Sequence, residues 1–167
     1  METPSEVCPT LFLLHGPETF RSRLESLLNS AERSLDILSE HLDPHLFSNE
    51  AICSAISALA RRHRLAEIRV MVKNPRQLVG YNHQLVRLQQ RLPSRIQLRH
   101  LTTAPQDNDR CYVIADGRQL LLQHKDGDYE GFYNSDAAPE AQALLEEYHE
   151  LWDRQTIDIP ELRRLSL

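Results

Sequence analysis

The sequence contains no run of about 20 apolar residues, so it lacks a segment that could cross a membrane as a helix. Its N-terminus has no basic stretch and only a short apolar run, which argues against a secretory signal. The three cysteines, Cys8, Cys53 and Cys111, lie far apart without CxxC spacing, which is typical of free thiols in a reducing compartment. That spacing also argues against structural zinc. We therefore expect a cytoplasmic protein without a metal or a cofactor.

The short motifs of several enzyme classes are also missing. The sequence has no glycine-rich phosphate loop, no GxSxG motif and no HExxH motif. Its 24 aspartate and glutamate residues outnumber 19 lysine and arginine residues, which gives a net charge of -5. This acidic balance argues against a surface dominated by nucleic-acid contacts, which is usually basic, but it leaves room for a local basic patch.

What is present fits one ordinary globular domain. Hydrophobic residues make up 41% of the 167 residues and charged residues 26%, so the chain can bury a core of its own. We expect a single domain over residues 1–155 and a C-terminal tail over residues 156–167.

Periodic apolar residues predict four helices, within residues 17–34, 48–64, 75–92 and 138–155. Ser48 is the candidate N-cap of the second helix, and Pro75 opens the third. Alternating patterns predict strands within residues 10–16, 34–44, 67–74, 95–102, 110–117 and 118–126, and one more short strand within 127–136. The pair Asp116-Gly117 is typical of a hairpin turn. This order predicts an α/β fold, a three-layer α/β/α sandwich with a mixed, mostly parallel sheet.

The element order resembles one phospholipase D-like domain over roughly residues 20–155. The segments that carry the resemblance are SLDILSEHLDPHLFSNEAICSAISALARR, EIRVMVKN, RIQLRH, DRCYVIADGRQLLL and the closing helix that ends in ELW. The chain is also similar to an uncharacterised bacterial phospholipase D-like domain that follows an N-acetyltransferase domain in some proteins. The resemblance implies the phospholipase D-like fold and an association with an acetyltransferase.

The active family has the signature HxKxxxxD, in which the histidine acts on phosphorus or the leaving group and the lysine holds phosphate oxygens. Asp116 matches the aspartate of this signature, which places Asp109 at the histidine position and Cys111 at the lysine position. An aspartate repels phosphate, and a cysteine supplies no cation at neutral pH. The resemblance therefore implies a pseudoenzyme with a degenerate motif, and we assign no catalytic residue.

The candidate ligand-binding residues lie around the degenerate motif and after a neighbouring strand. Asp109, Arg110 and Asp116 flank the motif strand, although strand alternation aims Arg110 at the opposite face from the lysine position unless a bulge rotates it. A structural ion pair among these three residues is the alternative. His41 follows the strand within 34–44, and strand C-termini line the pocket in open α/β sheets; an ordinary surface loop is the alternative.

Two further candidates depend on the helix within 75–92 and on the segment GFYN. His83 is either a binding residue or a partly buried, hydrogen-bonded histidine of the helix. Asn134 ends a stretch that echoes the family's GSxN motif but lies too far beyond Asp116. The segment RRHR at residues 61–64 ends the helix within 48–64, where the helix dipole favours cations. The series Arg87, Arg91, Arg95, Arg99 and His100 forms either a positive patch or a solvated face paired with carboxylates.

Three functions from different classes fit these observations. The first is a catalytically inactive phospholipase D-like domain that serves as a binding or regulatory module for a protein or nucleic-acid partner. The second is a divergent phosphodiesterase or nuclease-type hydrolase that uses His41, His83 or His124 with Asp109. The third is a structural dimerisation unit, in which a homodimer buries the former catalytic face.

Overall fold

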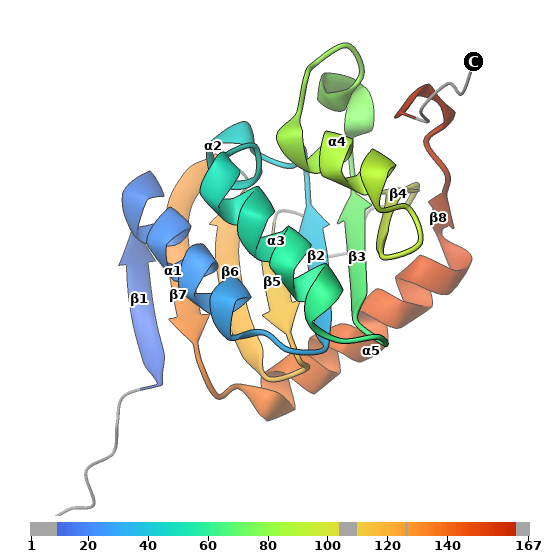
Figure 1. Cartoon of the computed structure of the whole chain (residues 1–167). Helices are drawn as coiled ribbons and strands as arrows, with labels where there is room; N and C mark the ends of the chain where they lie inside the picture. The colour runs from blue at the N-terminus through green and yellow to red at the C-terminus, as the bar shows by residue number, and fades with distance from the viewer. Residues whose placement is uncertain (1–9, 104–109, 126, 163–167) are drawn as a thin grey trace, which may run out of the picture.

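The computed structural model describes residues 10–103, 110–125 and 127–162, which form an eight-stranded sheet with the order β1-β7-β6-β5-β2-β3-β4-β8 (Figure 1). The strands are β1 (Leu11–His15), β2 (Ser34–Ser39), β3 (Glu67–Val72), β4 (Ile96–Leu101), β5 (Cys111–Ala115), β6 (Gln119–Lys125), β7 (Asp128–Asn134) and β8 (Thr156–Ile157). The helices are α1 (Pro17–Ser30), α2 (Pro44–Phe47), α3 (Glu50–Arg62), α4 (Gln84–Arg91) and α5 (Ala138–Arg154), with short 3-10 turns η1 (Pro75–Leu78) and η2 (Pro160–Leu162).

Helices cover both faces of the sheet, as the sequence predicts. Helices α1, α3 and α4 lie over one face, and α5 crosses the other (Figure 1). Each interface is a separate apolar cluster: Ile37 and Val70 belong to the core under α1 and α3, whereas Leu38 and Met71 pack with Tyr148 of α5. Neighbouring strand residues alternate between the two cores because successive side chains point to opposite faces. The α/β/α sandwich with a mixed sheet is therefore confirmed.

Parallel pairing is less extensive than the sequence suggests. Strands β2, β3 and β4 pair in parallel, and the other five pairings in the described chain are antiparallel. The reason is that only the first part of the chain alternates strands with crossover helices. The strands from β5 onward return through tight turns, and β1 joins the far edge beside β7.

The turn between β5 and β6 is the hairpin that the sequence predicts. Asp116 has φ 57° and Gly117 has φ 65°, and the N–H of Arg118 donates a hydrogen bond to the carbonyl of Ala115 at 3.0 Å. A β-turn with both central positions in the left-handed region matches the twist of the strands. The carboxylate of Asp116 also accepts hydrogen bonds from the backbone N–H groups of Glu32, Arg33 and Ser34, at 2.8 to 3.2 Å. This one side chain thus ties the hairpin to the start of β2.

The helix expected over residues 75–92 is interrupted, and the N-cap expected at Ser48 lies one residue later. The chain forms η1, turns at Gly80 with φ 79°, and begins α4 only after His83. Asn49 caps α3 by accepting a hydrogen bond from the backbone N–H of Ile52 at 2.9 Å. Apolar spacing alone does not reveal such a break, because η1 and α4 both bury leucines against the same core.

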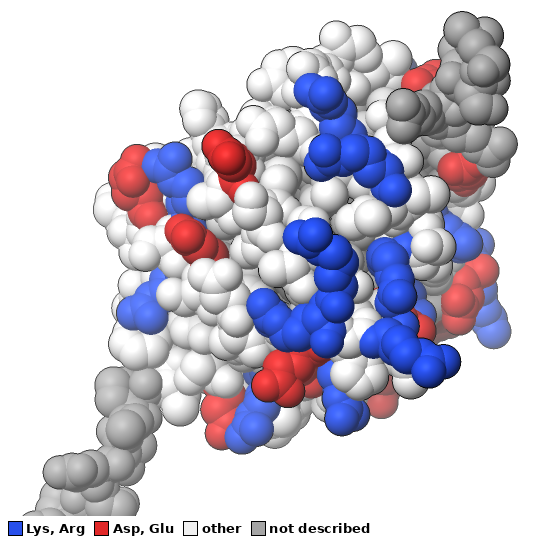
Figure 2. Space-filling view, viewed as in Figure 1, with Lys and Arg blue, Asp and Glu red and all other residues white. Residues whose placement is uncertain are grey.

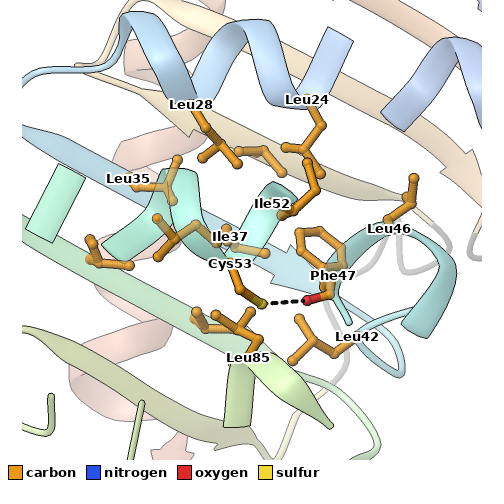
Figure 3. Packing of buried hydrophobic residues seen from close by; sticks show 14 of the residues in the cluster. Leu24, Leu28, Leu35, Ile37, Leu42, Leu46, Phe47, Ile52, Cys53 and Leu85 are labelled. Carbon is orange, nitrogen blue, oxygen red and sulfur yellow. Dashed lines mark hydrogen bonds between the residues drawn. The ribbon is translucent and has the colours of Figure 1, made fainter. Parts of the chain in front are cut away.

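The centre of the larger core lies between α3 and the sheet (Figure 3). Cys53 points into it, and its thiol donates a hydrogen bond to the backbone carbonyl of Phe47 at 3.2 Å. Cys53 and Cys111 are both buried, and Cys8 lies outside the described residues.

The segment expected as a tail packs on the domain as far as it is described. β8 pairs with the edge of β4, and Ile159 and Leu162 join the larger core. In the described part of the chain, no helix combines the length and apolarity needed to cross a bilayer.

Candidate functional site

The C-terminal ends of β2, β3 and β4 meet the start of β5 at one edge of the sheet. Lys73 follows β3 there, and its ammonium donates a hydrogen bond to the backbone carbonyl of Arg110 at 3.0 Å. Its Nζ atom also lies 3.9 Å from Glu40, which follows β2. The Lys73 side chain is only 7% exposed. This lysine, which the sequence did not single out, therefore ties three strand ends together.

Of the predicted site residues, His41 and Arg110 lie at this edge. The Nδ1 atom of His41 is buried and has no hydrogen-bond partner among the described residues. Tyr112 and Ile114 face α5, whereas Val113 and Ala115 face α1 and α3. Strand alternation, extended one residue before β5, gives the α5 side for Arg110. Asp109 lies outside the described residues.

His83 also lies near this edge, but both of its ring nitrogens are used within the protein. Nε2 contacts the backbone carbonyl of Leu42 at 2.9 Å, and Nδ1 accepts a hydrogen bond from the N–H of Leu85 at 3.1 Å. Accepting at Nδ1 and donating from Nε2 is the pattern of a neutral imidazole. Burial lowers the pKa of His83, whose side chain is 1% exposed. The structure therefore supports the structural alternative for His83.

Asp116 and Asn134 lie at the opposite end of the sheet. Asp116 follows the last residue of β5 and binds the backbone before β2, so it forms no ion pair with Arg110 at the other end of that strand. The side-chain oxygen of Asn134 accepts a hydrogen bond from the N–H of Asp136 at 3.0 Å, within the turn that follows β7. The five predicted site residues that the structure describes thus divide between two ends of the sheet, and they do not form one pocket.

A cleft of about 870 Å³ opens beside Lys73, between two walls of different chemistry. Its lining includes His100 of β4, and one wall is formed by Asn74, Pro75, Arg76 and Val79. The other wall is the segment from Ile157 to Glu161. The cleft thus lies at the ends of β3 and β4, and none of the five predicted ligand-binding residues that the structure describes lines it.

A second feature is a positive surface over α3 and α4, here called the arginine face (Figure 2). It comprises Arg61, Arg62, Arg64, Arg87, Arg91 and Arg95. The first three end α3 or follow it, and the others lie on α4 or in the turn before β4. Two arginine-rich segments that lie more than twenty residues apart in the sequence thus share one surface.

Backbone carbonyls hold part of the arginine face in place. Arg62 donates to the carbonyl of Ala31, just beyond α1, and Arg95 donates to the carbonyls of His63 and Arg64 at 3.4 and 2.5 Å. The final carbonyls of a helix have no partner within the helix, so these guanidinium groups satisfy acceptors that would otherwise need water. Within the described chain, none of the six arginines forms an ion pair with a carboxylate.

A depression of about 330 Å³ on this surface adds a polar pocket. It is lined by Arg87 and Arg91, one helical turn apart on α4, together with Cys53, Asn82 and Gln84. The solvated-face alternative predicted carboxylates beside these arginines, and the described residues do not provide them. Sequence reasoning identified both segments but could not predict that they share a face, because nothing in either segment encodes the packing of α3 beside α4.

The sequence matches one family profile, described as "Domain of unknown function (DUF7931)", over residues 16–165. The chain belongs to this family. Among curated proteins, none matches the sequence.

Several solved structures share the fold. The chain is similar to TrmBL2, described as an archaeal chromatin protein with a novel mode of DNA binding, with a TM-score of 0.66 and 13% identity over 94% of this chain and 57% of that one. It is similar to NucT from Helicobacter pylori, with a TM-score of 0.58 and 15% identity over 89% of this chain and 97% of NucT. It is also similar to phosphatidylserine synthase from Haemophilus influenzae Rd KW20, with a TM-score of 0.55 and 13% identity over 95% of this chain and 41% of that one. At these identities the similarity establishes the phospholipase D-like fold only.

Proposed function

We propose that this domain is a non-catalytic phospholipase D-like module that binds nucleic acid through the arginine face. The observation that carries the proposal is the gathering of six arginines on one surface, without carboxylate partners among the described residues. A guanidinium group matches the geometry of phosphate oxygens and stays charged at any physiological pH. A partner with regularly repeated phosphates therefore fits this surface.

The net charge of -5 does not oppose this function. Screening by salt limits the reach of a surface charge to about 8 Å at physiological ionic strength, so carboxylates on other faces act weakly on a ligand in contact with the arginines. Figure 2 shows the basic residues concentrated over α3 and α4 on an otherwise mixed surface. The local charge, and not the total, decides what binds.

Two further observations support a binding role. The positions that carry the histidine and lysine of the active family hold Asp109 and Cys111, which cannot perform their chemistry. A DNA-binding chromatin protein is among the structures with this fold. An acidic protein is the alternative partner for guanidinium groups, while a homodimer and an acetyltransferase association stay predictions.

The test is binding of a fluorescent DNA duplex, followed by polarisation over a range of salt concentrations. The variant Arg61→Gln/Arg87→Gln/Arg91→Gln removes three charges whose side chains do not hold distant backbone. We expect its affinity to fall roughly 10- to 100-fold at low salt, and the slope of log affinity against log salt to drop by about three. Binding of an acidic peptide with no binding of DNA would favour the protein alternative.

A matched control keeps the total charge change the same. Arg118→Gln/Lys125→Gln/Arg154→Gln also removes three positive charges, and all three positions are exposed and outside the arginine face. Arg118 and Arg154 form exposed ion pairs with Asp136 and Glu150, and such pairs contribute little stability. Equal losses in the two triple variants, or a wild-type protein that does not bind DNA at low salt, would refute the proposal.

The hydrolase alternative has less support from the geometry. It needs two of His41, His83 and His124 close together, and both nitrogens of His83 are used within the protein. No hydrogen bond connects any two of these histidines in the described chain. We expect purified protein to leave bis-p-nitrophenyl phosphate intact, and hydrolysis that is lost in Asp109→Ala would restore this alternative.

A further inference from the structure

We infer that the cleft beside Lys73 binds a small zwitterionic molecule, with an anionic group on one wall and a cationic amine on the other. Free amino acids and short peptides have this chemistry. The cleft is separate from the arginine face, shares none of its six residues, and serves a ligand of different charge. The inference therefore does not depend on the proposed nucleic-acid function.

The shape of the cleft suits a small molecule. Its volume of about 870 Å³ lies in the range of roughly 300 to 1,000 Å³ that is typical of ligand pockets. Its second wall is fixed, because Ile159 and Leu162 are buried in the core and Gln90 donates a hydrogen bond to the carbonyl of Leu162. The first wall is fixed by Asn74, whose side chain accepts a hydrogen bond from the N–H of Arg76 at 3.2 Å. A cleft with two anchored walls keeps its shape without a ligand.

The two walls of the cleft carry charged residues of opposite sign. Lys73 directly follows β3 and Arg76 lies in η1, both on the side of the first wall. Asp158 and Glu161 lie on the second wall. Lys73 is nine-tenths buried, and its position is set by Arg110 and Glu40. A ligand with one group of each sign can therefore pair with both walls at once.

Apolar side chains line the space between the charged groups. Val79 is 46% exposed and Ile157 is 55% exposed, and both line the cleft. Each lies on a different wall, beside Pro75 and Pro160. A pocket with apolar sides and a few placed charges is the common form of a small-molecule site. A ligand with a short aliphatic chain between its charged ends would cover both side chains.

The charge count argues against nucleotides and other polyanions. Among the lining residues that the structure describes, two are positive, Lys73 and Arg76, and three are negative, Glu40, Asp158 and Glu161. A ligand with two or more negative charges would meet net repulsion from this lining. A zwitterion carries no net charge and uses both walls.

The experiment is a titration followed by amide chemical shifts, with three probes of equal length. The probes are ε-aminocaproate, which carries both charges, caproate, which carries only the carboxylate, and hexylamine, which carries only the amine. We expect shifts at the amides of Arg76, Val79, His100 and Asp158. We expect ε-aminocaproate to bind roughly tenfold more tightly than either single-charge probe, because it gains a second ion pair in a partly desolvated cleft.

Two exposed positions test the two walls independently. Arg76→Gln should weaken binding of ε-aminocaproate and caproate and leave hexylamine unchanged. Glu161→Gln should weaken binding of ε-aminocaproate and hexylamine and leave caproate unchanged. Both variants should bind DNA as the wild type does, so failure of the cleft would be distinguishable from failure of the arginine face.

Several results would overturn the inference. One is the absence of shifts at the cleft amides with all three probes at millimolar concentration. Another is a single-charge probe, or adenosine monophosphate, that binds as tightly as ε-aminocaproate. A third is an equal loss of affinity for all three probes in either variant. Such a result would mean that the charge of the wall does not select the ligand.

Discussion

Arg95 donates hydrogen bonds to the backbone carbonyls of Arg64 and His63, and this contact joins the two arginine-rich segments of the protein. The acceptors lie just beyond the C-terminus of α3, where the helix dipole places partial negative charge. That charge offsets part of the repulsion between neighbouring guanidinium groups. The same interaction that stabilises the packing of α3 beside the turn before β4 therefore also concentrates positive charge on one surface.

Loss of this contact should affect both stability and binding. We expect Arg95→Ala to lower the free energy of unfolding by about 1 kcal/mol, a modest value because the hydrogen bonds are solvent-exposed. DNA affinity should fall in the same variant. Urea denaturation and polarisation measure the two effects. Arg87→Ala removes an equal charge from an exposed position on α4 and should lower affinity with a smaller change in stability; equal stability losses would contradict the role given to Arg95.

Asp116 should matter for folding and not for binding. Its carboxylate accepts hydrogen bonds from three backbone N–H groups at the start of β2, and its φ of 57° lies in the left-handed region. We expect Asp116→Ala to cost about 2 kcal/mol of stability, since it removes the acceptors and places alanine in a disfavoured conformation. Asp116→Asn should cost less, because asparagine tolerates this region and keeps one acceptor oxygen. Chemical denaturation checks the order, and a loss of DNA affinity in the folded Asp116→Asn protein would argue against a purely structural role.

The buried carboxyl of Asp36 should make stability depend on pH in an unusual direction. Burial raises the pKa of Asp36 from 3.8 to about 6, although Arg69, 3.8 Å away, lowers it and Glu67 raises it further. The folded protein therefore holds a proton that the unfolded chain has released between about pH 4 and pH 6. This contribution to stability is fully present below pH 3.8 and is lost as pH rises through about 6.

The variant Asp36→Asn isolates this effect. We expect the difference in unfolding free energy between the variant and the wild type to grow in favour of the variant by roughly 2 kcal/mol from pH 4 to pH 7. Urea denaturation at a series of pH values measures it, and other carboxylates cancel in the difference. A difference that stays constant across this range would mean that Asp36 titrates normally in the folded protein.

Local signals in the sequence were reliable where the structure is decided within a few residues. The pair Asp116-Gly117 forms the predicted hairpin because few other residue pairs accept positive φ twice in succession. The prediction of one helix over residues 75–92 was wrong in part. The apolar residues keep helical spacing across this segment, but Gly80 and the capping side chain of His83 interrupt the helix. The tail showed little periodicity, yet β8 and η2 form because β4 offers an open edge and the core accepts Ile159.

The candidate sites depended more strongly on tertiary structure. Asp116 and Arg110 lie at opposite ends of one short strand, so they could not form one pocket, although they are close in sequence. Lys73, which sequence analysis passed over, lies where three strand ends meet. Spacing along the chain therefore predicted which residues flank each strand, but only the strand order shows which ends lie side by side.

The sequence by itself determined the succession of strands and helices, the presence of helices on both faces of the sheet and the mismatch with the HxKxxxxD signature. These features depend on periodicity and residue identity. The tertiary structure decided that α3 and α4 bring Arg61 and Arg91 to one face, and that the segment from Ile157 to Glu161 closes a cleft beside Lys73. Such surfaces are assembled from residues far apart in the chain. Their charge and shape arise from packing and strand order, which no local pattern encodes.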